Sequence, residues 1–158
     1  MNIRVVRANL TEVQEQTQFR TLLRAYLADH MGRGQSPGEV ILRQSVQGVM
    51  SNPSSCVYFA YIDHVCVGMA VCFELYATFM ARKSINIHDL IVLPEFRRLG
   101  VARAILKHIE QEARAQDMGK ITLEVRSDNY VAQDLYKGQG FRECSPAMYF
   151  WVKHLQEY

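Results

Sequence analysis

The sequence has no apolar run that approaches the roughly 20 residues a membrane-spanning helix needs. It also has little excess charge, because 18 Lys and Arg residues face 16 Asp and Glu residues and leave a net charge of +2. This balance points neither to a nucleic-acid partner nor to a membrane surface. The first ten residues carry Arg4 and Arg7 without an apolar core, so we expect no secretion signal there.

Cysteine pairs with metal-binding spacing are absent as well. The four cysteines, at positions 56, 66, 72 and 144, form no C-x-x-C pair, and the histidines show no metal-ligand spacing. We therefore predict no metal site and free, buried thiols, which are typical of a reducing compartment. The cytoplasm is the expected location.

What remains is the composition of one ordinary folded domain. Of the 158 residues, 49% are apolar and 22% are charged, and neither a linker nor an internal repeat divides them. A chain of this length buries about two thirds of its unfolded surface, so it can fold without disulfides or a metal. We predict a single domain over residues 1–158.

Helical and strand periodicities alternate along the chain. Apolar residues at helical spacing predict a helix capped by Thr11, a second begun at Ser36 or Pro37, a third that runs from Ala102 to Gly119, and a short one from Asp128 or Asn129 to Gly138 or Gly140. Runs rich in β-branched and aromatic residues predict strands at Ile3–Arg7, Cys56–Ile62, Val65–Tyr76, Ser84–Leu93, Ile121–Arg126, Phe141–Glu143 and Met148–Lys153.

The order of these elements predicts the fold class. Asp63 and His64 fit a tight hairpin turn, and only the connection through the helix at Ala102 fits a parallel crossover. The loop at Met31–Gly38 joins the first two helices. The expectation is an α/β domain with a mixed, largely antiparallel central sheet flanked by helices.

One segment, Pro94–Arg103, carries a recognisable binding pattern. A strand ends at Pro94, a turn with Arg97 and Arg98 follows, and Gly100 opens a helix. The first amides of a helix lack internal partners and lie at the positive end of its dipole, and a glycine lets the backbone approach an anion. The segment predicts a phosphate site with arginines at its rim; a tight turn with solvated arginines is the alternative.

The same segment resembles a known family. Residues 97–102, Arg-Arg-Leu-Gly-Val-Ala, match the R/Q-x-x-G-x-G/A motif of the GCN5-related N-acetyltransferases (GNAT). Upstream, Asn86–Glu95 looks like the fourth strand of that family, and downstream Asn129–Phe141 matches its N-x-x-A-x-x-L-Y-x-x-x-G-F pattern. Each motif alone is weak, but both in order, separated by an amphipathic helix and a strand, are specific.

The resemblance implies a GNAT-like fold and an N-acetyltransferase that moves an acetyl group from acetyl-CoA to a primary amine of a small molecule in a ternary complex. A protein or peptide acceptor, or an acyl-CoA-binding module without turnover, is the alternative. Dimers are common among proteins that resemble this chain, so a homodimer is one expectation. The residues that the resemblance places at CoA are Leu90, Ile91, Val92, Arg97, Arg98, Leu99, Gly100, Val101, Ala102, Arg103, Asn129 and Tyr136.

Acetyl transfer to an amine needs a base, donors for an oxyanion and a proton for the thiolate. Tyr136 is the candidate acid, with packing on its helix face as the alternative, and a strand bulge near Ile91–Val92 is expected to offer an amide. His88 lies where several relatives have a glutamate, so it is the first candidate base; a structural role in the sheet is the alternative. Asp89 falls on the opposite face from His88 unless a bulge resets the strand, and Glu124 is the third candidate.

The acceptor pocket carries no motif. An aromatic and acidic lining suits a cationic amine, although core packing is the alternative for each aromatic residue. The candidates are Tyr26, Asp29, Phe73, Tyr76, Phe79, Asp89 and Glu124.

Overall fold

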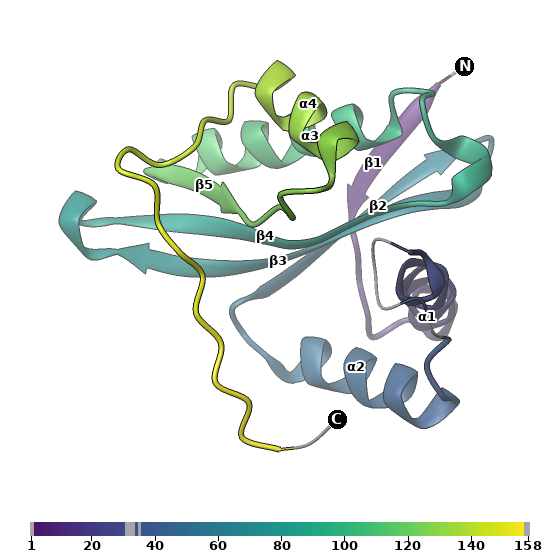
Figure 1. Ribbon diagram of the computed structural model, residues 1–158. Coiled ribbons are helices and arrows are strands. Elements are labelled where there is room, and N and C mark those ends of the chain that lie inside the picture. Colours follow the sequence, from purple (N-terminus) through teal and green to yellow (C-terminus); the bar gives the residue numbers. More distant parts are fainter. Residues whose placement is uncertain (1, 31–33, 35, 157–158) are drawn as a thin grey trace.

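A five-stranded sheet forms the centre of the computed structural model, which describes residues 2–30, 34 and 36–156 (Figure 1). The strands lie in the order β1-β2-β3-β4-β5, and all neighbours are antiparallel except β4 and β5. The elements are β1 (Ile3–Arg7), α1 (Val13–Ala28), α2 (Glu39–Ser51), β2 (Ser55–Ile62), β3 (Val65–Ala77), η1 (Thr78–Met80), β4 (Arg82–Val92), η2 (Pro94–Phe96), α3 (Val101–Ala115), β5 (Lys120–Leu123) and α4 (Tyr130–Gly138).

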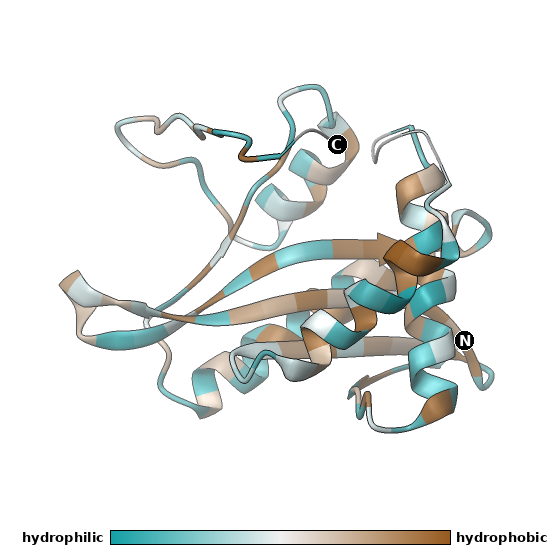
Figure 2. Ribbon diagram, turned by 90° about the horizontal axis from the view of Figure 1, so that it is seen from below, coloured by the Kyte–Doolittle hydropathy of each residue, from teal (hydrophilic) through white to brown (hydrophobic). Residues whose placement is uncertain are grey.

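Each face of the sheet packs against different helices, and the resulting α/β architecture confirms the fold class (Figure 1). On one face, α1 and α2 bury Phe19, Leu22 and Leu42 against Phe59 and Met69 of the sheet. On the other face, α3 packs over the strands, and the short helix α4 lies beside it. Figure 2 shows hydrophobic segments along the strands, between helices whose surfaces alternate between hydrophobic and hydrophilic residues.

Helix α3 is the crossover between the two parallel strands. Its buried residues recur at helical spacing, which produces one apolar face toward the sheet. Gly68 of β3 lets this face come close, because a Cβ there would lie 3.0 Å from Ile91 O and from Val101 Cγ1. The buried positions of the helix are Val101, Ile105, Leu106, Ile109 and Ala113.

Helix α3 begins within one residue of the predicted start, but it ends at Ala115, before the predicted end at Gly119. Asp117, with φ 52°, takes the left-handed position after the helix, and the amide of Met118 donates to Ala113 O at 2.9 Å. Gly119 therefore does not close the helix. Its lack of a side chain instead makes room for Met80, since a Cβ would lie 3.0 Å from Met80 Cε.

The hairpin between β2 and β3 confirms the turn predicted at Asp63 and His64. Both residues have positive φ, 46° and 68°, as a two-residue turn between right-twisted strands requires. The turn fixes a register in which Ile62 lies opposite Val65, and β2 then pairs along its whole length with β3.

Several predicted boundaries are wrong. Thr11 does not cap α1: Glu12 holds the N-cap position, no side chain caps the helix, and the hydroxyl of Thr11 donates to Asn9 Oδ1 at 2.7 Å. Helix α2 begins at Glu39, after the predicted start. Strand β5 ends at Leu123, before the predicted end at Arg126. Half of the predicted loop at Met31–Gly38, residues 31–33 and 35, lies outside the described residues.

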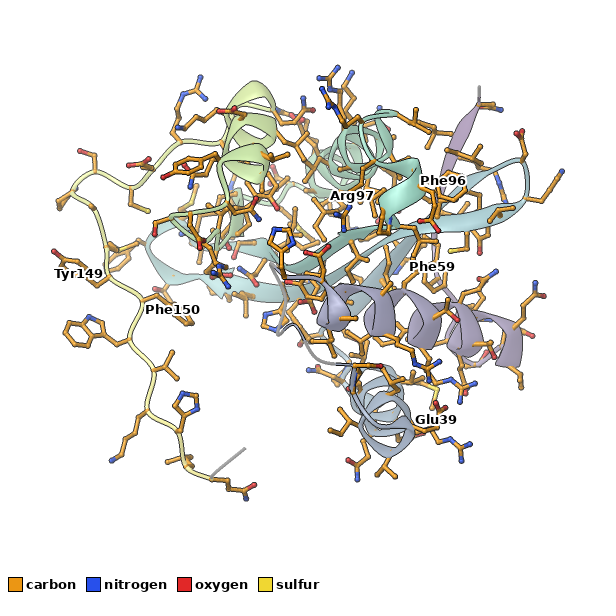
Figure 3. All side chains as sticks on the ribbon, turned by 45° about the vertical axis from the view of Figure 1, so that its right-hand side comes forward. Glu39, Phe59, Phe96, Arg97, Tyr149 and Phe150 are labelled. Carbon is orange, nitrogen blue, oxygen red and sulfur yellow. The ribbon has the colours of Figure 1, made fainter. Side chains whose placement is uncertain are left out.

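The two predicted strands after α4 do not form. Residues 141–156 contain no strand, and the apolar side chains of the stretch that begins at Met148 are exposed. The composition of this stretch favours a strand, but β-propensity acts only where a strand has a neighbour to pair with. Figure 3 shows Tyr149 and Phe150 on an extended chain that runs past the domain without packing into it.

The packing of α3 predicts where a small change destabilises the fold. Ile105 is 0% exposed at the centre of the core between α3 and the sheet. We expect Ile105→Ala to lower the free energy of unfolding by about 2–5 kcal/mol, because it removes buried methyl groups and leaves a cavity. Urea unfolding measures this, with Val40→Ala on the exposed side of α2 as a control expected to change it by less than about 0.5 kcal/mol. Equal effects of the two substitutions would contradict this packing.

Candidate active site

Strands β4 and β5 separate half-way along the sheet. Their pairing runs from Ser84 and Lys120 to Ile87 and Leu123, whereas β4 continues to Val92 and pairs with β3 at every residue except His88. The amide of Leu93 donates to Val67 O at 2.9 Å, so peptide groups that alternate with it, at Leu90 and Val92, point to the opposite, open edge. The split thus exposes strand backbone inside the fold.

A cleft of about 780 Å³ occupies this split. Its walls come from both faces of the sheet, because α1 contributes one side and α3 and α4 the other. The structure brings together here all the residues proposed for CoA: Leu90, Ile91, Val92, Arg97, Arg98, Leu99, Gly100, Val101, Ala102, Arg103, Asn129 and Tyr136.

The loop before α3 has the backbone shape of an anion cradle. Arg98 and Gly100 both have positive φ, 64° and 89°, and no side chain caps the first turn of α3. Its free amides therefore point into the cleft entrance with the helix dipole behind them. A Cβ at Gly100 would meet only Ile3 Cδ1, at 3.9 Å, so the glycine is required by its φ angle and not by crowding from the protein.

Caps at both ends of helix α4 fix the position of Tyr136. Asn129 caps the start, since its Oδ1 accepts from the amide of Ala132 at 3.2 Å. At the other end Gly140, with φ 88°, lets the amide of Phe141 donate to Tyr136 O at 3.0 Å, and the two rings pack edge to face at 5.8 Å. The Asn, Tyr, Gly and Phe of the second sequence motif thus belong to one short helix, capped at both ends, that fixes the position of the tyrosine.

Tyr136 is a protonated donor at neutral pH. Burial, and to a lesser extent the neighbouring Tyr26, raise the pKa of Tyr136 to about 12. Tyr26 approaches the same cleft from α1, on the opposite side of the split. Burial and then the charge of Asp89 raise the pKa of Tyr26 as well.

A bulge in β4 falls at His88 and not near Ile91–Val92, where the register is regular. Val71 pairs with Asp89 while Cys72 pairs with Ile87, so His88 has no partner on β3. The bulge therefore resets the alternation of the strand. The open amides at the split belong to β4, at Leu90 and Val92, and are unpaired among the described residues because the pairing with β5 stops at Ile87.

The reset turns His88 and Asp89 toward the same face, the one covered by α1 and α2. Asp89 shares that face with its partner Val71, and the ring of His88 packs edge to face on Phe73 at 5.6 Å. Burial raises the pKa of Asp89, and the neighbouring His88 offsets part of the rise. Asp89 is thereby a better proton acceptor than an ordinary exposed carboxylate.

Glu124, in the chain after β5, contacts Asn86, which lies two residues before His88 on β4. Asn86 Nδ2 donates to Glu124 Oε1 at 3.2 Å and to Thr122 Oγ1 at 3.1 Å. Asn86 was not among the predicted residues; its polar side chain between Ile85 and Ile87 is the signal that could have revealed it.

Other predicted acceptor residues are divided between two places. Tyr26 and Asp29 line the cleft, and Phe73 contacts His88 beside it. Tyr76 and Phe79 are exposed and away from the cleft, because they lie at the β3–β4 hairpin end, next to the start of β4, whereas the cleft lies at the other end of that strand.

The described residues contain no group of three or more His, Cys, Asp or Glu side chains able to hold a metal ion. Within the same part of the chain, no helix combines the length and apolar character needed to span a bilayer.

Comparison with known proteins agrees with this geometry. Residues 19–141 match the Acetyltransferase (GNAT) family, a span that contains the split, the anion cradle and both ends of α4. The chain belongs to this family. The match confirms the family that the motifs indicated and extends it upstream to α1.

The individual relatives in this family share only a modest sequence identity with the chain. Mouse N-acetyltransferase family 8 member 7 is 27% identical over 108 residues, 68% of this chain and 48% of that protein. The ribosomal protein bS18-alanine N-acetyltransferase of Escherichia coli K12 is 34% identical over 60 residues, 38% of this chain and 40% of that protein. The chain thus spans about half the length of the curated relatives it matches. A crystal structure of a probable acetyltransferase shares the fold, with TM-score 0.84 and 22% identity over 98% of this chain and 99% of that one.

The anion cradle can be tested by charge alone at Gly100. Asn and Asp are nearly equal in size and both tolerate positive φ better than other side chains. We expect Gly100→Asp to bind CoA at least tenfold more weakly than Gly100→Asn, because only Asp places a negative charge among the cradle amides. Isothermal titration with CoA measures both affinities. Equal affinities would mean that the CoA phosphates bind elsewhere.

Proposed function

We propose that this GNAT protein is an acetyl-CoA-dependent N-acetyltransferase that acts on a primary amine of a small molecule. The observation that carries the proposal is the cleft through the split sheet. It joins an anion cradle at Gly100, the open strand edge at Leu90 and Val92, and the tyrosine Tyr136.

The residues present fit acetyl-CoA. Free amides at the start of α3, with Arg98 and Arg103 nearby, suit a pyrophosphate, and the open edge of β4 suits the amides of a pantetheine arm. Asn129 Oδ1 accepts one hydrogen bond as the helix cap, and its amide nitrogen, which has no hydrogen-bond acceptor among the described residues, can donate to a ligand. The cofactor supplies an activated acetyl thioester.

The chain's own groups meet the three needs of acetyl transfer. The open-edge amide of Val92 can donate to an oxyanion, a role that requires a donor fixed before the reaction. Tyr136 keeps its proton at neutral pH and can donate it toward a sulfur at the split. On the α1 side, Asp89 and His88 can accept the proton that an ammonium must lose, directly or through water.

The acceptor would enter from the α1 face. Asp89, Glu124 and His88 form a polar patch there, next to the aromatic ring of Phe73, which suits a cationic amine. The cleft itself is bounded by Tyr26 and Asp29 of the α1 side, and a site enclosed in this way suits a small molecule. The similarity to a ribosomal-protein alanine N-acetyltransferase favours a peptide acceptor as the second candidate.

Tyr136→Phe tests the acid. We expect the substitution to lower kcat by about 10²–10⁴ while the Kd for CoA changes by no more than about threefold, because the ring that packs on Phe141 remains. Steady-state kinetics and titration with CoA give the two numbers. A parallel loss of both, or of neither, would remove Tyr136 from the mechanism.

A thermal-shift screen with acetyl-CoA, followed by small amines and by peptides with free N-termini, tests the function itself. Acetyl-CoA at a hundredfold excess over Kd should stabilise the protein by about 2.7 kcal/mol. Turnover of small amines but not peptides is the expected result, and the reverse would favour the second candidate. Absence of any shift would contradict the whole proposal. All four thiols are free, which supports a cytoplasmic location. The prediction that they are buried is right for Cys56 and Cys72 and wrong for the exposed Cys144.

We also propose a homodimer. The side chains from Met148 to Val152 are 60–86% exposed, and β5 pairs with no strand on its outer edge among the described residues. A strand-forming apolar segment and an open sheet edge are complementary, so a second copy of the chain is the occupant we expect. Light scattering should give twice the chain mass for the wild type and a monomer for Phe150→Ser/Trp151→Ser. A monomeric wild type would contradict the dimer.

A further inference from the structure

Arg97 joins three elements that are distant in the sequence. Its Nη2 lies 2.8 Å from Oδ2 of Asp29, the residue that ends α1. Its Nε donates to the carbonyl of Val92 at 3.2 Å, at the open edge of β4. Arg97 itself begins the cradle loop after η2, and Figure 3 shows it above α1. One guanidinium thus connects the acceptor-side helix, the split strand and the anion cradle.

The contacts of Arg97 differ from those expected of a phosphate ligand. The carboxylate of Asp29 neutralises the guanidinium, and the carbonyl of Val92 occupies a further donor of the same planar group. The side chain of Asp29 is only 14% exposed, whereas that of Arg97 is 46% exposed. A carboxylate so shielded depends on its charged partners more than a surface carboxylate does. The other oxygen of Asp29, Oδ1, lies 3.2 Å from Nδ1 of the neighbouring His30, so Arg97 is the partner that ties it to the cradle loop.

We propose that Arg97 and Asp29 form a positioning clasp that fixes the anion cradle against the end of α1, and that Arg97 does not bind a phosphate of CoA. The positive charge at the cradle then comes from Arg98 and Arg103, for which no ion pair is found among the described residues. The inference rests on the proposed use of acetyl-CoA and assigns a different role to one residue of its motif.

The clasp has a consequence for both sides of the cleft. Asp29 and Tyr26 lie one helical turn apart at the end of α1 and line the same cleft as the cradle loop. Ordering of the loop around CoA therefore also orders the end of α1, where the amine is proposed to enter. Binding of the two substrates becomes coupled through the pair of Arg97 with Asp29.

A double-mutant cycle distinguishes a clasp from a phosphate ligand, because the two roles predict opposite changes in CoA affinity for Asp29→Asn. If Arg97 is a clasp, Arg97→Gln and Asp29→Asn should each weaken CoA binding by roughly fivefold or more, and the double variant should be no weaker than either single one. If Arg97 binds phosphate, Asp29→Asn should instead tighten CoA, because it removes a competing carboxylate. Tightening, or fully additive losses in the double variant, would overturn the clasp.

Salt dependence gives a second, independent readout. Loss of a phosphate contact makes binding less sensitive to ionic strength, whereas loss of a positioning contact does not. The slope of log Kd for CoA against log salt should therefore fall in Arg98→Gln and stay unchanged in Arg97→Gln. A reduced slope in Arg97→Gln would also overturn the clasp.

Asp117→Asn supplies the matched control. It breaks an exposed pair of similar length, Arg82 Nη1 to Asp117 Oδ1 at 2.9 Å, that lies outside the cleft, and it should leave CoA affinity unchanged. Urea unfolding without ligand checks that every variant is folded. A wild type that fails to bind CoA would refute the proposed function, whereas normal wild-type binding with additive variants would refute only the clasp.

Discussion

Strand β4 is paired with β3 along its length but with β5 only between Ser84 and Ile87. A parallel neighbour must be reached through a crossover, and α3 supplies it by packing across the sheet and returning the chain at Lys120. Because β5 is only four residues long, the second half of β4 keeps an open edge. An open edge inside a domain is costly unless something else uses its peptide groups. The cleft, the cradle and α4 all surround that edge.

The turns and the helix cap that surround the open edge of β4 each involve only a few residues. Three residues with positive φ, at Arg98, Gly100 and Gly140, turn the chain at the start of α3 and at the end of α4. One side-chain cap, at Asn129, begins α4. Each device depends on residues within a few positions of one another, so each leaves a short and specific trace in the sequence. Together they hold backbone amides on one wall of the cleft and a tyrosine hydroxyl on another.

This locality explains how much the sequence could predict. The hairpin at Asp63 and His64, the amphipathic face of α3 and the capped helix α4 depend on neighbouring residues, and they were predicted. The bulge at His88 depends on a register with β3, and the pair of Arg97 with Asp29 joins residues 68 positions apart. The strand predicted at Met148–Lys153 failed for the related reason that propensity does not supply a pairing partner. Contacts between residues that are far apart in the chain produce no periodic pattern in the sequence from which they could be predicted.

The bulge matters most for the chemistry because it decides which charges share a face. With regular alternation Asp89 would point toward α3, on the side of the arginine-bearing cradle. The extra residue places it on the α1 face instead, together with His88 and Glu124. Asp89 and Glu124 thereby lie on the opposite face of the sheet from α3, whose start carries Arg98 and Arg103, unpaired among the described residues, whereas Arg97 is paired with Asp29. In the proposed reaction, an anionic cofactor and a cationic amine would then be attracted to opposite mouths of one cleft and would meet only where β4 and β5 part.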